Sequence, residues 1–451
     1  MSLERVDAVV VGGGLAGLTT ARDLTARGLS AVVLEARSRV GGRILNHTFP
    51  NGVVVELGGQ WVGPTQDRVL SLAAELGAEL FPTFDSGDSL VSIEGQTRRF
   101  SDDSFGLPDE AREEVELTQK TLEEMALTVP LLDPWTAPEA TRWDRQTVET
   151  WIEDNVRTPE ARDFWRLLVA AVFAAESWDI SLLHFLFYVH SGGLIDRLIS
   201  TAGGAQESRI IGGSQILAKR LADRLGDAIR LSSPVGEIVQ TADGAEVVAG
   251  GTTIRSRRVA VAVPPALAAR IRYSPALSPL RDQLTQKMPM GYVIKCMAMY
   301  PEPFWREEGL SGFAVDLADP VGVIFDNSPP DAGYGVLLCF VEGRHGRILG
   351  ELPAEGRKAV VIAALERFFG PRAADPIDYV DQNWAAEEWT RGCYGAHLAP
   401  GAWTQFGKAL RRPCGMIHWA GTETSDVWNG YMEGAIRSGK RVAREIFDAL
   451  A

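Results

Sequence analysis

The chain of 451 residues lacks an apolar run long enough to span a bilayer. Its longest candidate, LLVAAVFAA at 167–175, is bounded by Arg166 and Glu176, whereas a membrane helix needs about 20 apolar residues. Basic residues are also scarce, with 45 Lys and Arg against 59 Asp and Glu, a net charge of −14. Because nucleic-acid affinity comes mainly from phosphate neutralisation, we expect neither a nucleic acid nor a membrane as partner.

Cysteine and histidine are too few and too scattered to form a disulfide framework or a metal site. The four cysteines include no C-x-x-C pair and the six histidines no H-x-x-x-H cluster, so we expect free thiols and no metal. The opening residues MSLERVDAVVV lack the basic-then-apolar layout of a secretory signal. We therefore expect a cytoplasmic protein.

A strand–turn–helix–strand pattern occupies the first 35 residues. The apolar run 6–11 is typical of a buried parallel strand, and the glycine-rich GGGLAG at 12–17 follows it directly. Apolar spacing predicts a helix over 18–27, and a second strand is expected over 31–34. This order is the one that a dinucleotide-binding motif requires.

Each glycine of this motif has a mechanical reason, and an acidic residue follows at the expected distance. Gly12 permits the tight turn, Gly14 lets the backbone approach a pyrophosphate, and Gly17 lets the helix pack on the strand. Glu35 can accept hydrogen bonds from an adenosine ribose. The pattern predicts a dinucleotide site.

Further glycine turns favour FAD over a nicotinamide cofactor. RSRVGGR at 37–43 offers backbone N–H groups and arginines to phosphate, and ELGGQW at 56–61 allows close approach to a flat ring. Near the C-terminal end, the strand–turn–helix pattern at 417–435 directs N–H groups and a positive helix end toward a ligand. Such an end suits a ring that carries negative charge.

The pattern along the rest of the chain predicts an α/β protein with a Rossmann-like FAD-binding domain interleaved with an α+β substrate-binding domain. Helices are expected over 109–127, 163–175, 182–189, 360–369 and 431–449, and short strands over 229–231, 235–239, 246–249 and 258–263. The expected FAD-binding segments are 1–80, 209–285 and 390–451, and the substrate-binding segments are 81–208 and 286–389.

At these motifs the chain resembles the flavin-containing monoamine oxidases, within the wider FAD-dependent amine oxidase family. The resemblance runs through VVVGGGLAGL, VVLEARSRVGGR, ELGGQWVGPTQ, RGCYGAHLAPGAW and HWAGTETSDVWNGYMEGA. It implies oxidative deamination of small primary amines by O2 to aldehyde, ammonia and hydrogen peroxide. The membrane-anchored members carry a C-terminal tail that this chain lacks, so we expect a soluble protein, and a homodimer stays open.

The resemblance also implies a cofactor site. The residues expected to hold the ADP half are Gly12, Gly14, Gly17, Glu35, Arg37, Arg43 and Val235. Those expected at the ribitol or the flavin ring are Gly58, Gly59, Gln60, Trp384, Thr422, Glu423 and Met432. Cys393 matches the cysteine that bonds covalently to flavin in monoamine oxidases.

Three residues match the family's catalytic positions. Lys295 corresponds to the lysine that holds a water at the flavin, and Tyr394 and Tyr431 correspond to paired tyrosines that position the amine. The amine must be neutral for its lone pair to assist oxidation, yet an alkylamine resembles Lys, whose pKa is about 10.4. A desolvated aromatic slot lowers that pKa.

The substrate wall favours monoamines with apolar or aromatic tails. Ile199 and Gln206 match wall positions of monoamine oxidases, and Val323 stands where putrescine oxidases place a carboxylate. With Phe325 the stretch is apolar until Asp326, which keeps a putrescine-type diamine oxidase open as the alternative. An unpaired second ammonium in such a pocket would cost at least about a few kcal/mol. An amino-acid oxidase would need an arginine over the flavin, which we cannot assign.

Overall fold

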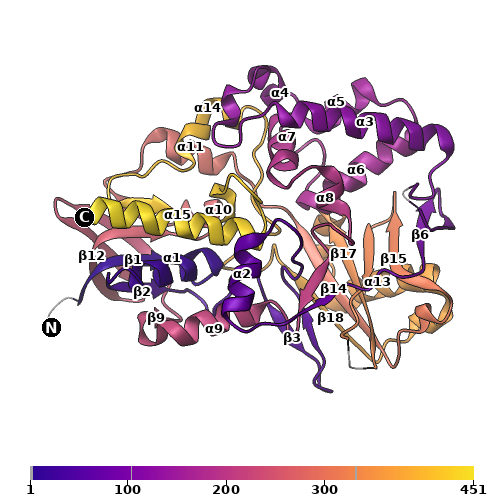
Figure 1. Ribbon diagram of the computed structural model, residues 1–451, viewed down its shortest axis with the longest axis horizontal. Helices are drawn as coiled ribbons and strands as arrows, with labels where there is room; N and C mark the ends of the chain where they lie inside the picture. The colour runs from indigo at the N-terminus through magenta and orange to yellow at the C-terminus, as the bar shows by residue number, and fades with distance from the viewer. Residues whose placement is uncertain (1–3, 103, 331–332) are drawn as a thin grey trace.

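The computed structural model describes residues 4–102, 104–330 and 333–451 and contains two large sheets that lie side by side (Figure 1). The strands of the first sheet are β1 (Glu4–Val11), β2 (Ala31–Leu34), β9 (Ile229–Arg230), β10 (Val235–Thr241), β11 (Gly244–Ala249), β12 (Thr252–Val261), β13 (Arg272–Ser274) and β19 (Ile417–Trp419). Their order is β13-β10-β11-β12-β1-β2-β9, with β19 beside β12. β1 pairs in parallel with both β2 and β12, so the turn after β1 opens at the carboxyl edge of the sheet.

The second sheet lies beside this edge. Its strands are β6 (Asp88–Ile93), β7 (Gln96–Phe100), β14 (Val293–Tyr300), β15 (Leu310–Asp316), β16 (Val323–Asp326), β17 (Gly335–Glu342) and β18 (Asp378–Asn383). Their order is β18-β14-β17-β16-β15-β6-β7. The described strands also form two separate two-stranded sheets: β3 (Asn46–Thr48) pairs with β4 (Val54–Glu56), and β5 (Leu80–Pro82) pairs with β8 (Ser208–Ile210).

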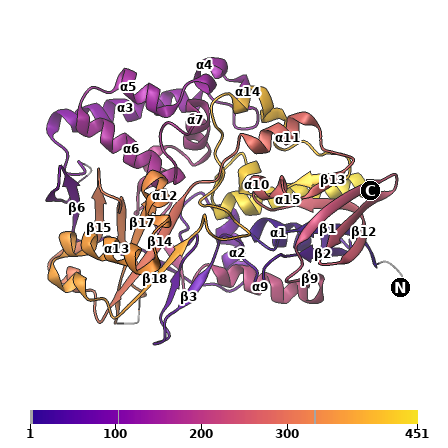
Figure 2. The same cartoon turned by 180° about the vertical axis from the view of Figure 1, so that it is seen from behind.

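Helices cover both faces of the second sheet. One group is α3 (Asp109–Leu127), α4 (Ala140–Arg145), α5 (Val148–Asn155), α6 (Pro159–Phe173), α7 (Leu182–Ser191) and α8 (Ile195–Ile199). The other pair is α12 (Gly343–Gly350) and α13 (Ala354–Phe369), seen in front of the strands in Figure 2. Alternate side chains of β14 serve the two layers: Met297 packs in the core shared with the first group, and Cys296 packs in the core shared with α13. This double burial explains why β14 is apolar at nearly every position.

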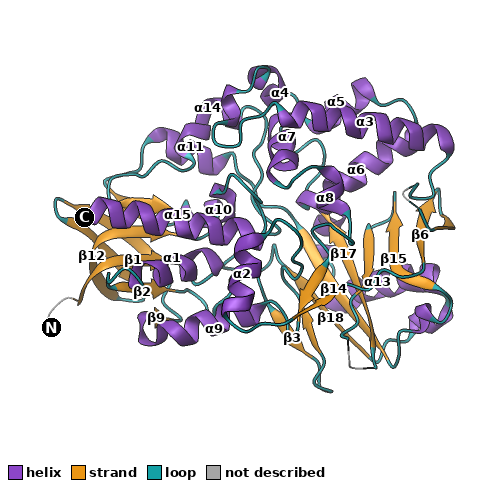
Figure 3. Cartoon of the chain, viewed as in Figure 1, coloured by secondary structure: helices purple, strands orange, loops and turns teal. Residues whose placement is uncertain are grey.

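The remaining helices belong to the first sheet or link the two regions. They are α1 (Leu15–Thr25), α2 (Asp67–Glu75), α9 (Gln215–Leu225), α10 (Pro265–Ala268), α11 (Pro279–Gln286), α14 (Ala402–Phe406) and α15 (Met432–Leu450). α1 and α15 lie side by side (Figure 3), in contact at Gly439, where an added Cβ would meet Ala16 O at 2.4 Å. The last helix therefore packs directly on the first glycine motif.

The predicted α/β class is confirmed, and most predicted elements are present with shifted ends. The helix predicted over 109–127 is α3 itself, but α1 begins three residues earlier than predicted, directly after Gly14. The strand predicted from 258 begins at Thr252, because β11 and β12 form an antiparallel hairpin. The domain boundaries stay a prediction, and residues 1–3 of the first segment lie outside the described residues. None of the described helices combines the length and apolar composition that a bilayer crossing requires.

Candidate functional site

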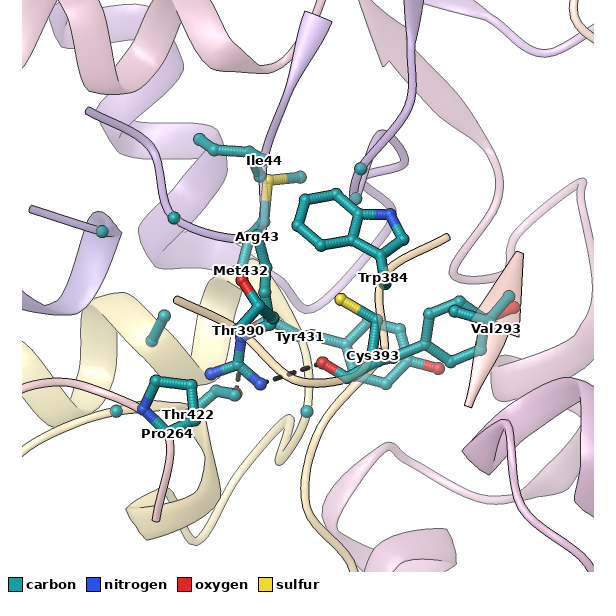
Figure 4. Close-up of a pocket in the computed structure, with 18 of the residues that line it drawn as sticks. Arg43, Ile44, Pro264, Val293, Trp384, Thr390, Cys393, Thr422, Tyr431 and Met432 are labelled. Carbon is teal, nitrogen blue, oxygen red and sulfur yellow. Dashed lines mark hydrogen bonds between the residues drawn. The ribbon is translucent and has the colours of Figure 1, made fainter. Parts of the chain in front are cut away.

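A cavity of about 750 Å³ lies where the two sheets meet, and most of the expected site residues line it. Its wall includes Gly12, Gly14, Glu35, Arg37, Arg43, Gly58, Gly59, Gln60, Ile199, Gln206, Val235, Lys295, Val323, Phe325, Trp384, Cys393, Tyr394, Thr422, Tyr431 and Met432. Figure 4 shows part of this wall, with Arg43, Trp384, Cys393, Tyr431 and Met432 around a common space. Residues up to 424 positions apart in the chain (Val11 and Ala435) thus share one cavity.

The end of the cavity beside β1 has the features that a dinucleotide needs. Gly12 has φ +107°, and an added Cβ would meet Ala262 O at 3.0 Å. The carboxylate of Glu35 accepts hydrogen bonds from the N–H groups of Gly13 at 2.7 Å and Arg37 at 2.9 Å. The first turn of α1 contains no acidic residue, so its N–H groups and positive end can face a pyrophosphate.

Two residues that were expected to bind the cofactor, Gly17 and Glu423, are not among the residues that line the cavity. Gly17 lies inside α1, where an added Cβ would meet Gly12 O at 1.9 Å, so it serves helix packing. Glu423, expected at the ribitol or flavin ring, instead accepts two hydrogen bonds from Arg43, at 2.6 and 3.1 Å. Burial opposes both charges, but each partner outweighs it, raising the pKa of Arg43 and lowering the pKa of Glu423. Glu423 therefore fixes Arg43, which also donates to the carbonyl of Tyr394 at 2.9 Å.

Lys295 projects from β14 into a buried polar network. Its Nζ donates to Gly58 O at 2.8 Å and to Gln60 Oε1, and Gln60 Nε2 donates to Asn327 Oδ1 at 2.6 Å. Burial lowers the pKa of Lys295 to about 7, against the opposing effect of Glu56. An ammonium that titrates near neutral pH can gain and lose a proton at the cavity wall.

Tyr394 lies in the segment before α14, and Tyr431 lies directly before α15. Both residues line the cavity. The Tyr394 hydroxyl donates to Glu342 Oε1 at 2.6 Å, and the Tyr431 ring lies 6.1 Å from the Tyr188 ring, centroid to centroid. Burial raises the pKa of both phenols, so both stay neutral. The two residues thus present uncharged aromatic surface.

Cys393 and Trp384 form the adjoining wall. Cys393 is 4% exposed, and its sulfur points toward the Trp384 side chain in Figure 4. Burial raises the pKa of the thiol to about 12. The Trp384 indole donates to Leu57 O at 2.8 Å, which fixes the ring beside the Gly58–Gly59 turn.

The far part of the cavity is mainly apolar. The Phe325 ring packs 5.0 Å from Trp61, centroid to centroid, and Gln206 Nε2 donates to Leu198 O at 3.0 Å. Other apolar side chains on this part of the wall are Ile199, Leu167, Leu168, Phe313, Val323 and Phe340. This composition suits an apolar or aromatic substrate tail.

Asp326 faces away from the cavity. It follows Phe325 on β16, so its side chain lies on the opposite face of the sheet. Its carboxylate accepts hydrogen bonds from Trp305 Nε1 at 2.9 Å and Arg306 Nε at 2.8 Å. It therefore cannot receive a second ammonium in the cavity.

Several wall residues were not identified from the sequence: Trp61, Tyr188, Phe340 and Glu342. Glu342 is the least expected of them, because it is a carboxylate 5% exposed at the end of the apolar strand β17. A lone acid that ends a run such as GVLLCFVE is the signal that could have indicated it.

The geometry agrees with the comparisons to known proteins. A model of the family "Flavin containing amine oxidoreductase" matches residues 15–447.

The chain belongs to this family.

The amine oxidase [flavin-containing] of Oncorhynchus mykiss is 39% identical over 450 residues, which cover 98% of this chain and 85% of that protein. A structure of wild-type putrescine oxidase bound to putrescine has 35% identity and a TM-score of 0.95, covering 98% of this chain and 99% of that one. Cyclohexylamine oxidase from Brevibacterium oxydans has 33% identity and a TM-score of 0.95, with 99% of each chain covered. The enzyme is a flavin-dependent amine oxidase with a Rossmann-like FAD-binding fold, and it oxidatively deaminates amines.

Removing the Glu423 carboxylate should destabilise the enzyme strongly. Glu423→Gln removes the partner charge from the guanidinium of Arg43, whose side chain is 22% exposed, and should cost about 2–3 kcal/mol of unfolding free energy. As a control, Glu116→Gln breaks an exposed ion pair with Arg112 on α3 and should change the unfolding free energy little. Urea unfolding of the two holoenzyme variants measures both, and equal losses would contradict the role given to Glu423.

Proposed function

We propose that this amine oxidase acts on primary monoamines with apolar or aromatic tails and produces aldehyde, ammonia and hydrogen peroxide with O2. The observation that carries the proposal is the apolar wall around Phe325 and Val323, from which Asp326 is turned away. A distal ammonium at this wall would lose its hydration without gaining the carboxylate of Asp326. The putrescine-type alternative is supported by overall similarity and by one carboxylate of the wall, that of Glu342, which already accepts a hydrogen bond from Tyr394.

The residues of the cavity have separate tasks in this reaction. Bound FAD supplies the electron acceptor for oxidation of the carbon next to nitrogen. Tyr394 and Tyr431 bind and orient the amine with uncharged rings, and the apolar wall excludes water. Loss of water lowers the pKa of the amine, because desolvation disfavours the ammonium. Lys295 holds an exchangeable proton at Nζ, which lies beside the rings of Trp61 and Phe340.

We further propose that Cys393 holds FAD covalently through Sγ. Its support is the position of the thiol in the cavity wall, next to Trp384 and preceding Tyr394. Glu35, the glycine turn and Arg37 would hold the adenosine and phosphate end, and Thr422 and Met432 the flavin end. A cytoplasmic location and a homodimer stay predictions.

A peroxide-coupled assay tests the substrate class. We expect kcat/KM for benzylamine or phenethylamine to exceed that for putrescine at least about tenfold, since about 1.4 kcal/mol of lost binding already gives that ratio. Asp326→Asn should leave the ratio unchanged, because Asp326 faces Trp305 and Arg306. Faster turnover of putrescine than of every monoamine would refute the proposal.

Acid precipitation tests the covalent link. The yellow colour should stay with the precipitated polypeptide of the wild type and of Cys414→Ala, which changes a thiol outside the cavity wall. Cys393→Ala should release its flavin to the supernatant. Release of all flavin from the wild type would show that Cys393 forms no such bond.

A further inference from the structure

Glu342 places a carboxylate in the substrate part of the cavity. It is the last residue of β17, and Phe340, two positions earlier, lines the same wall. Residues two apart on a strand share a face, so the fold itself directs Glu342 toward the cavity. The other two carboxylates on the wall belong elsewhere: Glu35 serves the glycine turn, and Glu388 is exposed.

The two oxygens of Glu342 have different surroundings. Oε1 accepts the hydrogen bond from Tyr394, the tyrosine assigned to hold the amine. Among the described residues we find no hydrogen-bond donor to Oε2, and Glu342 itself lines the cavity. One oxygen is thus fixed to the amine site, and the other is open to a donor from the cavity.

Within the part of the chain that the structure describes, no cation is paired with this carboxyl group. The opposite strand presents Val293, α6 presents Leu167, and the titratable groups that face it are Tyr394 and Glu176. Burial raises the pKa of Glu342 to about 8, with the Tyr394 bond acting in the opposite direction and Glu176 raising it further. Lys295 is engaged with Gly58 and Gln60 instead.

An amine arrives with a proton that it must lose. In water, an ammonium with a pKa near about 10.4 and a carboxyl group with a pKa of about 4.3 would both stay charged. Burial moves the two pKa values toward each other, because it disfavours both ions. Proton transfer between them removes two charges at once and leaves a neutral pair, which a water-poor cavity favours.

We propose that Glu342 accepts the proton that the alkylammonium substrate releases in this cavity. The N–H bond breaks with its electron pair left on nitrogen, and an O–H bond forms on Glu342. Ammonium and carboxylate become amine and carboxylic acid, with no change in oxidation state. The inference rests on the proposed oxidation of monoamines and names the residue that prepares the substrate.

The pH dependence of kcat/KM for benzylamine tests this role. Glu342→Gln keeps an acceptor for the Tyr394 hydroxyl but cannot take up a proton. We expect it to lower kcat/KM most, by up to about 100-fold, near pH 8 to 9, where Glu342 is ionised while the substrate is still an ammonium. The deficit should shrink steadily as the pH passes the ammonium pKa of about 10.4, because the amine is then neutral in solution.

Matched variants separate this role from packing and from surface charge. Glu351→Gln removes one exposed negative charge just after α12 and should leave the profile unchanged. Glu342→Leu also removes the acceptor of the Tyr394 hydroxyl, so it should show the same pH-dependent deficit together with a further loss that is equal at all pH values. The visible spectrum of bound flavin verifies that each variant is folded and loaded.

The remaining outcomes overturn the proposal in distinguishable ways. A deficit equal at all pH values would reduce Glu342 to a structural role, and an unchanged profile would show that the proton leaves elsewhere. If Glu342→Gln lost activity toward putrescine alone, Glu342 would be assigned to binding a second ammonium instead. Failure of the wild type to oxidise any monoamine would refute the proposed function itself.

Discussion

The cost of holding a charge away from water governs the site between the two sheets. Burial drives the isolated groups toward their neutral forms: it lowers the pKa of Lys295 and raises those of Glu342, Cys393 and the two tyrosines. A permanent charge persists in the wall where a partner stabilises it, as Glu423 does for Arg43. The enzyme thereby offers an amine an environment in which the uncharged form is favoured.

This environment depends on how the second sheet is covered. Helices pack on both of its faces, so β14 and β17 are almost wholly apolar, and the polar exceptions are Lys295 and Glu342. Both exceptions line the cavity. The second sheet therefore supplies a mainly apolar surface. The first sheet supplies a polar one, the glycine turn after β1, whose N–H groups can bind phosphate. The cavity joins a polar end for a dinucleotide to an apolar end for a substrate tail.

The sequence predictions were most accurate where they depended on patterns within a short stretch of the chain. The β1–α1–β2 motif depends on spacing within 35 residues, and α3 depends on a helical period, so both could be predicted. Contacts between side chains far apart in the sequence could not be predicted. The pairing of Glu342 with Tyr394 joins residues 52 apart, and that of Arg43 with Glu423 joins residues 380 apart. The direction of Asp326 depends on strand register, which no residue type alone reveals.

The central claim is that an amine in this cavity meets a bound flavin in an environment that favours its neutral form. Anaerobic mixing of the purified enzyme with benzylamine, followed by the visible absorbance of the flavin, tests it most directly. We predict complete bleaching of the flavin band in a single turnover, with a rate that increases with pH as the ammonium loses its proton. A band that no amine bleaches, or a rate that falls as the neutral amine accumulates, would contradict this account.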